Sequence, residues 1–522
     1  LMEEEGIYYQ FEHHEDKHVL VLHDSPIGHD VAPGCEALPL RAEAGGAGAA
    51  DSVWDWGADH QVLPGALSLE AYDFKNPTKP LRVLDRLDRE HAHDEFEVFD
   101  YSTRYVEVDD GDRLARVRLE SIQAAHRVYS GASDARGLRT GGLIRFRQTR
   151  NRVDQPMLVT AAEYRMRSDA YESGRGSEEP VFECRFEALP LGVPFRTAQT
   201  TTRPEIRGPQ TAMVVGPEGQ EIYVDEHARV KVQFHWDRYG KRDDSSSCWI
   251  RVSQPWAGGK FGAMFIPRIG HEVVVEFLEG DPDRPLITGR VYNGANAVPH
   301  DLPANATVSC IRSESSPGGG GFNELRFEDK KGSEEVYLHA QKDRLVVVNN
   351  NNTESVGANE TLGVSGDRAK TVNGNETTNV GGNRTENVAG NEAVSVGGNR
   401  ALTVAGNDAT TVGANQSTAV GANQSTMVGA NQSTVVGANR TVAVGANEQA
   451  SVASMRTTVV GMMDSLNVGL IQNINAGIAI AINAGVVLSL VSPGGSITLT
   501  PSGIEIKGKS VKIEGDIVEI NP

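Results

Sequence analysis

Aromatic side chains are missing from the last 185 residues of this 522-residue chain, because all 31 Phe, Trp and Tyr lie at or before Tyr337. An aromatic-rich globular core is therefore excluded there, since these side chains dominate the buried area of such cores. Long apolar runs are missing too. The nearest candidate, residues 486–491, is far shorter than the roughly 18 residues that a membrane-spanning helix needs.

Cysteine is scarce: only Cys35, Cys184, Cys248 and Cys310 are present, far apart and without a CxxC pair. This usage predicts reduced thiols in a protein made in a cytosol, with neither a disulfide framework nor a zinc site. No N-terminal signal peptide is recognisable, so export would require another route. No cofactor-binding motif is found.

Positive charge is in deficit, because the formal net charge is −20. This argues against a nucleic-acid partner held by phosphate neutralisation. The acidity belongs mainly to the front half, since residues 351–460 hold only 14 charged side chains, eight acidic and six basic. The length itself predicts two to four domains.

What the chain has in abundance is an eight-residue repeat, the octad. Valine occupies every eighth position twelve times in succession, at Val356, Val364, Val372, Val380, Val388, Val396, Val404, Val412, Val420, Val428, Val436 and Val444. Asparagine follows three residues later, with Asp367 as the one replacement, at Asn359, Asn375, Asn383, Asn391, Asn399, Asn407, Asn415, Asn423, Asn431, Asn439 and Asn447. The valine register persists at Val452, Val460 and Val468.

Each octad has the composition of one short strand and one corner. The Gly, Ala and Asn that follow each valine suit a turn, and the remaining Val, Thr, Ser and Ala suit a strand. A helix is excluded, because a glycine in each octad would cost about 1 kcal/mol relative to alanine. We therefore predict a rod of octads over residues 349–470. A calcium-binding solenoid would need repeated Asp, and the octads supply only Asp367 at the Asn position.

One firm apolar side chain per octad encloses very little core if the chain coils alone. Three intertwined chains would bring their valine rows to a shared axis, so we favour a trimeric β-helix with these valines as its core. A slender single-chain solenoid remains the alternative. At about 4.8 Å per strand, twelve octads would extend the rod by about 58 Å.

The regions before the octads are predicted to be β-rich. Residues 1–199 form a first β domain, and residues 197–209 include a linker. Five or so short strands in residues 210–295 fit a small barrel of the OB type. Residues 296–348 are expected to be loop followed by a neck hairpin, with strands at 324–328 and 335–339.

After the octads, in residues 471–522, the period shortens to seven and the aliphatic side chains become larger. Apolar pairs flank one polar residue in each repeat, and we predict that they pack a tapering tip. These residues are Ile497, Leu499, Ile504, Ile506, Val511, Ile513, Val518 and Ile520.

Two stretches carry a resemblance to a known family. Residues 229–238 read Arg-Val-Lys-Val-Gln-Phe-His-Trp-Asp-Arg, and residues 266–277 read Ile-Pro-Arg-Ile-Gly-His-Glu-Val-Val-Val-Glu-Phe. With residues 280–293 they resemble the Vgr spike proteins of type VI secretion systems, which are similar to a phage tail hub and spike. The resemblance implies a mainly β protein with a hub-like domain, an OB barrel and a long intertwined trimeric β-helix.

The resemblance further implies a structural, membrane-puncturing spike without enzymatic activity. Its expected partners are two further copies of itself, a ring-forming tube protein at the hub end, and a tip-sharpening protein or effector toxin at the C-terminal tip, with transient contact to a target membrane. It would be made in a bacterial cytoplasm and exported by the type VI machine.

Two departures from the family pattern stand out. Members usually carry more hub sequence before the motif at residues 2–7, so we expect part of the hub to be missing here. The phage spike has a lysozyme domain between barrel and rod, whereas residues 293–346 are too few for such an enzyme.

Possible chemistry in the sequence has plainer explanations. His13, His14 and His18 lack a second ligand-bearing strand, and His91 and His93 are similarly isolated. His271-Glu272 lacks the second histidine of a zinc-protease helix. We therefore predict no catalytic, cofactor-binding or metal site. Alternatives that remain are a phage-type tail spike or baseplate protein and an adhesin-like β-solenoid.

Overall fold

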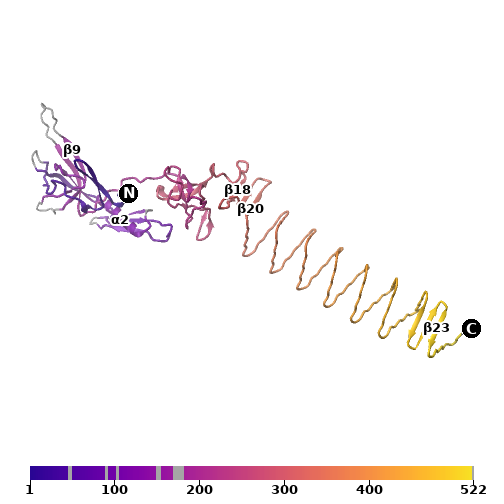
Figure 1. Ribbon diagram of the computed structural model, residues 1–522. Helices are drawn as coiled ribbons and strands as arrows, with labels where there is room; N and C mark the ends of the chain where they lie inside the picture. Colours follow the sequence, from indigo (N-terminus) through magenta and orange to yellow (C-terminus); the bar gives the residue numbers. More distant parts are fainter. Residues whose placement is uncertain (45–49, 89–91, 102–104, 148–154, 168–180, 520–522) are drawn as a thin grey trace. The chain divides into compact units, whose positions relative to one another are not determined.

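The computed structural model describes residues 1–44, 50–88, 92–101, 105–147, 155–167 and 181–519, and Figure 1 shows its ribbon. The chain divides into two compact units, Leu1–Leu362 and Gly363–Pro522. Strands far outnumber helices, which confirms the predicted mainly β class. No helix among the described residues combines the length and the apolar composition that a bilayer crossing requires.

An antiparallel five-stranded sheet carries the first core of Leu1–Leu362. Its strands lie in the order β3 (Val53–His60), β7 (Arg127–Ser133), β10 (Val181–Pro190), β9 (Met157–Arg167) and β8 (Leu143–Ile144). Cys184, Phe186 and Ala188 recur at every second position of β10 and are buried against Val53 and Val159. This two-residue period is what a strand with one covered face requires.

A second core lies between three strands and a helix. The strands lie in the order β5 (Val83–Arg86), β4 (Ala66–Glu70) and β6 (Glu97–Tyr101), and α2 (Val108–Gln123) packs on them. Leu67 and Leu69 from β4 meet Ala115 and Leu119 from α2 in one buried cluster. The sequence analysis did not identify this helix, although its apolar residues at 115, 119 and 122 are spaced as on a helix face.

The N-terminal residues form hydrogen bonds to residues 197–209, the segment that the sequence predicts as a linker. After α1 (Met2–Glu5), strands β1 (Tyr8–His13) and β2 (His18–His23) form an antiparallel hairpin. The Glu3 carboxylate accepts hydrogen bonds from the Thr201 amide at 3.1 Å and its hydroxyl at 2.6 Å, and these bonds lower the pKa of Glu3. Arg203 donates two 2.5 Å bonds to Glu4, so the segment is docked, not free.

A third core occupies a five-stranded sheet whose two edges meet. The strands lie in the order β12 (Lys231–Phe234), β11 (Gln210–Val215), β16 (Glu272–Phe277), β17 (Pro285–Val291) and β13 (Arg251–Val252). An antiparallel bridge between Val230 and Ile250 joins the first edge to the last. The cluster of buried Ala212, Val232 and Val273 lies among these strands. A closed sheet of five short strands is the arrangement of an OB barrel.

Short elements flank these sheets. Near the N-terminus lies the 3-10 turn η1 (Pro26–Gly28), and η2 (Leu278–Gly280) links β16 to β17. Strands β14 (Trp256–Ala257) and β15 (Gly262–Ala263) form a small antiparallel ribbon, which lies between β13 and β16 in the sequence.

The neck is a three-stranded antiparallel sheet. Strands β19 (Glu324–Glu328) and β20 (Glu335–His339) form the predicted hairpin, which the structure confirms. A third strand, β18 (Val308–Arg312), pairs with β19 and was not expected from the sequence.

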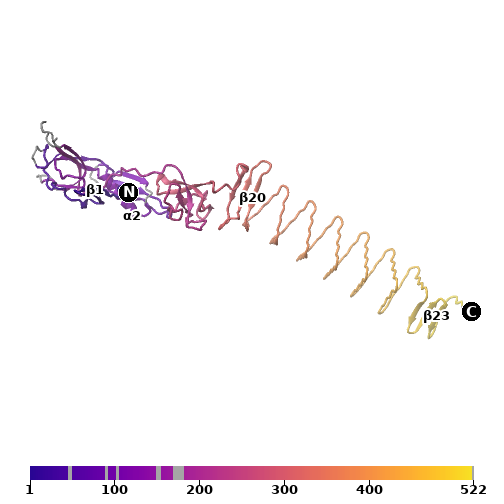
Figure 2. The same cartoon turned by 45° about the horizontal axis from the view of Figure 1, so that its top comes forward.

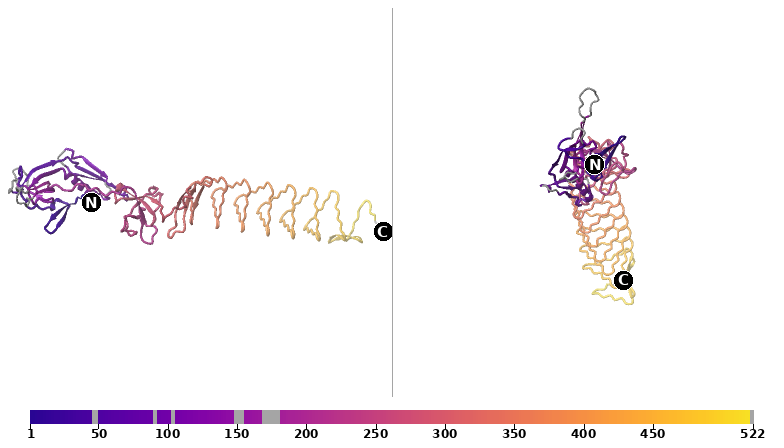
Figure 3. Two further views of the ribbon diagram at one scale, coloured as in Figure 1. Left: turned by 90° about the horizontal axis from the view of Figure 1, so that it is seen from above. Right: turned by 90° about the vertical axis from the view of Figure 1, so that its left-hand side faces the viewer.

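The octads contain no strand in this single chain. Between β20 and β21 (Leu488–Ser492) the backbone is extended, with a two-residue bend every eight residues as far as Gly485-Val486. The part that belongs to Gly363–Pro522 winds as an open coil, which Figures 1, 2 and 3 show from different sides. A strand needs a hydrogen-bonded neighbour, and the coil supplies none.

The chain regains regular structure after the octads. Strands β21, β22 (Gly495–Thr500) and β23 (Gly503–Gly508) form an antiparallel sheet. In its register Ile497 pairs with Ile506, and Leu499 pairs with Ile504.

Candidate assembly surface

The octad valines form one row with a constant place in the backbone. Each of them stands directly before a two-residue bend, as Val404 does before Ala405-Gly406 and Val412 before Gly413-Ala414. Each corner asparagine follows its bend, as Asn407 and Asn415 do. The row therefore repeats in structure as well as in sequence.

Side chains on the two sides of the octad differ in how much of their surface is exposed. The twelve valines are 44–50 % exposed, whereas Met427, Val435 and Val459, one residue before a valine of this register, are 87–94 % exposed. Successive side chains of an extended segment point to opposite sides. The valines therefore share one side of the coil, and the residues before them point to the other.

No residue that the structure describes covers the valine side. Every residue from 341 to 487 is exposed, and a Cβ added to any octad glycine would meet no atom within 4 Å. Burying the exposed half of each valine would stabilise an assembly by about 1 kcal/mol per side chain, taking full burial as about 2 kcal/mol. A row this long and this regular is an exposed apolar surface of the kind that marks a contact with other chains.

The predicted tip residues fall into two groups. Ile497, Leu499, Ile504 and Ile506 lie on one face of the β22–β23 pair, where Leu490 is opposite Ile497. Val511, Ile513 and Val518 follow the sheet outside any strand and are 48–62 % exposed. Ile520 lies outside the described residues. The tip packing of these residues stays a prediction, because in this chain they are not buried.

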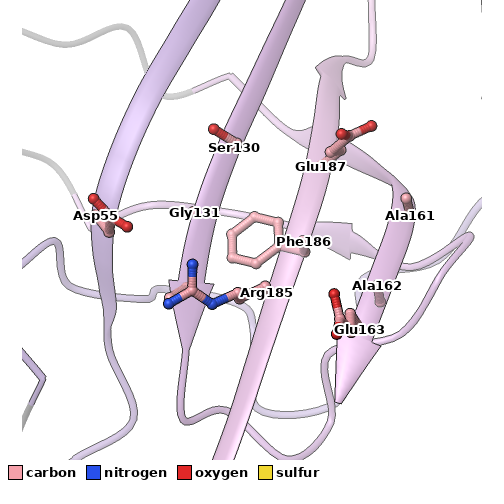
Figure 4. Close-up of a pocket in the computed structure, with 10 residues that line it drawn as sticks. Asp55, Ser130, Gly131, Ala161, Ala162, Glu163, Arg185, Phe186 and Glu187 are labelled. Carbon is pink, nitrogen blue, oxygen red and sulfur yellow. The ribbon is translucent and has the colours of Figure 1, made fainter. Parts of the chain in front are cut away.

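A hollow of about 340 Å³ lies along the first sheet, and Figure 4 shows its lining. Arg185, Phe186 and Glu187 come from β10, and Asp55 comes from β3. The Arg185 guanidinium is already bound to the Glu183 carboxylate at 3.0 Å. Its ten lining residues include no His or Cys and only one hydroxyl, on Ser130.

One cluster of ligand-type side chains was missed by sequence analysis. The ligand atoms of His300, Cys310 and Glu324 lie within 4.8 Å of one another, and His300 Nε2 is 2.6 Å from the Glu324 carboxylate. Their spread over 25 residues gives no recognisable ligand spacing. Arg312 and Arg326 lie opposite Glu324 and Cys310 in the β18–β19 register, and their positive charges oppose a divalent cation.

The third member of the cluster is a thiol, and burial raises the pKa of Cys310. We interpret the cluster as an internal hydrogen-bonded His–Glu pair that holds the loop before β18 against the neck sheet.

The histidines considered from sequence do not gather into a further cluster in the part of the chain that is described. His13 and His18 are exposed on the β1–β2 hairpin, with their Nδ1 atoms 2.8 Å apart. His271 directly precedes strand β16, and burial lowers its pKa. His91 lies outside the described residues.

Three family models match successive parts of the chain. The phage tail baseplate hub model matches residues 1–170, and the type VI secretion system/phage-baseplate injector OB domain matches residues 221–292. The bacteriophage T4 gp5 C-terminal trimerisation domain matches residues 309–420 and 407–483, which include all twelve octads of the valine row.

Curated relatives support the same family. The type VI secretion system spike protein VgrG1b of Pseudomonas aeruginosa PAO1 is 46 % identical over 363 residues, which are 68 % of this chain and 49 % of that protein. The chain belongs to the Vgr spike family. VgrG1a of the same organism is 46 % identical over 68 % of this chain and 56 % of its own length.

A more distant relative is named as a toxin. The actin cross-linking toxin VgrG1 of Vibrio cholerae is 36 % identical over 69 % of this chain and 33 % of that protein. The chain thus spans about half the length, or less, of these Vgr relatives.

Solved structures give weaker likenesses. The Escherichia coli c3393 protein, a type VI secretion component described as similar to T4 tail proteins gp27 and gp5, aligns with a TM-score of 0.35 and 18 % identity over 56 % of this chain and 58 % of its own. The lidded Francisella PdpA-VgrG complex aligns with a TM-score of 0.38 and 6 % identity over 65 % of this chain and 55 % of its own. The family assignment therefore rests on the sequence relatives.

Proposed function

We propose that this chain is the structural spike of a contractile secretion machine and acts as a homotrimer. The observation that carries the proposal is the open coil of residues 341–487, in which a continuous valine row has no cover from its own chain. The match of the trimerisation-domain model to the same residues favours two further copies as that cover.

The mechanical role follows from the packing of such a rod. Three chains would bury their valine rows, from Val356 to Val444, on one axis, and the corner asparagines would stack at its edges. Interchain backbone hydrogen bonds between stacked strands would run nearly parallel to the axis and oppose compression. A narrow, stiff rod concentrates the force of contraction on a small area of membrane.

The ends of the molecule would carry the partners. We propose that the hub-like region, residues 1–199, sits on a tube of ring-forming proteins, and that the OB barrel of residues 210–295 braces the trimer. The neck of residues 296–348 would lead into the rod of residues 349–470. The tip of residues 471–522, with its exposed Val511, Ile513 and Val518, would receive a sharpening protein or an effector toxin.

The chain is proposed to act without enzymatic activity. The curated relatives VgrG1a and VgrG1b are named as spike proteins. Between strand β17 and the octads, residues 292–340 form only loops and the three neck strands, which leaves no space for a hydrolase domain. The protein would be made in the bacterial cytoplasm and leave the cell through the machine itself.

A complementation experiment tests this function. A type VI-active strain that lacks its own copy of this gene receives the wild-type gene, the V404D/V412D variant, or the matched outward-facing variant T403D/T411D. We expect wild type and T403D/T411D to restore release of the tube protein and killing of prey cells, and V404D/V412D to restore neither. Full activity of V404D/V412D would contradict the shared-core spike.

A further inference from the structure

The charges of the octad region occupy one place in the repeat. Ten of the 14 charged side chains in residues 351–460 lie four residues after a valine of the eight-residue register, counted from Val356 to Val452. We call this place the fifth position. The first block of this position is Glu360, Arg368, Glu376, Arg384, Glu392, Arg400 and Asp408. Three glutamines, at 416, 424 and 432, separate it from a second block, Arg440, Glu448, Arg456 and Asp464.

Within each block the sign alternates without exception. All nine neighbouring pairs consist of one acidic and one basic residue, so the sequence behaves as a sixteen-residue charge repeat laid over the eight-residue valine repeat. The neutral Asn352 and Gln416 border the first block. A merely solvated face needs charge but has no need of alternation.

The single chain does not pair these side chains with one another. Among the described octads, the ion pairs are Lys370 with Glu376 and Arg384 with Glu386, and the latter measures 2.9 Å between exposed side chains. Each joins a fifth-position residue to a residue at another place in the repeat. Contacts between successive fifth positions require strands that this chain leaves apart.

The intertwined trimer of the proposed function, on which this inference rests, supplies those contacts. When three parallel copies wind about a threefold axis, each octad moves a chain to the next face and up by one strand. An octad of one copy then lies about 4.8 Å from the following octad of its neighbour on the same face. Glu376 of one chain would lie beside Arg384 of the next, and Arg384 beside Glu392.

We propose that the alternating fifth-position charges set the register in which three copies of this chain wind together. The valine and asparagine rows cannot do so, because a slip of eight residues places valine on valine and asparagine on asparagine again. The same slip brings Glu beside Glu and Arg beside Arg along each face. Opposite charges on adjacent strands stabilise the pairing, and like charges destabilise it.

The charges select register and not the number of chains. In a closed single-chain solenoid with three octads per turn, neighbours on a face would be three octads apart, and this odd spacing also pairs opposite signs. The open coil, in which no octad residue is covered by its own chain, is what assigns the neighbouring strands to other copies.

An exchange of two charges tests the proposal at constant composition. In E376R/R384E the net charge is unchanged, but positions 368 and 376 both become positive and positions 384 and 392 both become negative. We expect the trimer to melt about 5–10 °C below wild type in low salt, and the difference to shrink in about 1 M salt, where the screening length is near 3 Å.

The matched control reverses all seven charges of the first block, from E360R to D408R, and so keeps the alternation. We expect it to melt within about 2 °C of wild type. A control as unstable as E376R/R384E, or an exchange variant as stable as wild type, would overturn the proposal. Light scattering on wild type distinguishes failure of the proposed trimer from failure of the proposed register. A monomeric wild type refutes the trimer itself. A trimer whose stability is insensitive to the exchange refutes only the role of the charges in setting the register.

Zero-length cross-linking reads the register directly. In R384K, a carbodiimide can couple the new amine to a carboxylate in contact with it. The proposal predicts chains linked on a denaturing gel, with position 384 joined to Glu376 or Glu392 in the linked peptides. Links from position 384 confined to Glu386 within one chain, or to Glu360 and Asp408, which lie three octads away, would contradict the proposed register.

Discussion

The region before residue 341 and the octads differ in where their cores are. Leu67 and Leu119 are 0 % exposed within one chain, packed between β4 and α2. Val404, which stands for the equivalent valine of each octad, is 44 % exposed. The described part of its own chain offers no layer that packs against it. Stability is thus an intrachain property of the first region and, on our proposal, an interchain property of the second.

Composition explains this difference. The first region has all of the aromatic residues, and its sheets bring together strands that are distant in the sequence and bury each other's side chains. The octads have small polar side chains and one valine each, and they advance without returning. A chain of that kind gains its free energy from a partner, and its apparent stability should therefore depend on concentration.

Aspartate in the valine row should break the comparison most severely. V404D/V412D would place six carboxylates on the shared axis of a trimer, where unpaired charge cannot be accommodated. We expect loss of the trimer at micromolar concentration, measured as solution mass, while the circular dichroism of the N-terminal sheets is kept. T403D/T411D carries the same charge on the opposite side and should remain trimeric. A trimeric V404D/V412D would refute the shared core.

A cavity in the first region should destabilise it independently of assembly. Leu67→Ala removes a fully buried side chain, and the free energy of unfolding of this region should fall by about 2–5 kcal/mol. Urea denaturation at two protein concentrations, monitored by Trp fluorescence, should show the same loss at both. The control Leu84→Ala removes a side chain that is 46 % exposed on the adjacent β5, and its effect should be much smaller. A loss of unfolding free energy that varies with protein concentration would contradict the account that the stability of the first region is an intrachain property.

Acid should weaken the first region by a smaller amount through His29. This ring is 6 % exposed. Its Nδ1–H donates to the Gly141 carbonyl at 2.7 Å, so Nε2 of the neutral ring accepts from the Tyr8 hydroxyl at 2.9 Å. Burial, and secondarily the charge of His23, lowers the pKa of His29. The unfolded chain therefore binds a proton more readily than the folded one.

The direction of the pH effect follows from that difference. The contribution of His29 is fully present above the unfolded pKa of about 6.5 and is lost as the pH falls towards the lower folded pKa. We expect the urea midpoint of the first region to fall between about pH 7.5 and 5.5, and to fall less in His29→Gln. His60→Gln, at an exposed position on β3, should keep the wild-type dependence. An unchanged dependence in His29→Gln would remove His29 as its source.

Local patterns account for what could be predicted from sequence. The two neck strands and the turn between them are complete within a few residues, and this hairpin appears where expected. The octad period sets the spacing of the bends, which continue beyond Val468 to Gly485-Val486 although the valines there give way to Ala476 and Ala484.

Long-range partners account for what was missed. The pairing of β18 with β19 and the contact of His300 with Glu324 join segments whose separation carries no periodic signal. Helix α2 was obscured by Gly111 and by the charged residues of its first turns, although Leu119 lies on its buried face. The alternation at the fifth position is present in the sequence, but it acquires meaning only once the coil is seen to be open.

The solution mass of the purified chain, measured by light scattering, tests the central claim most directly. The account predicts a mass of three times 56.1 kDa, because the valine row lacks a cover that only further copies would provide. A mass of 56.1 kDa with octad amides protected from hydrogen exchange would contradict it, since a single chain would then have closed its own core.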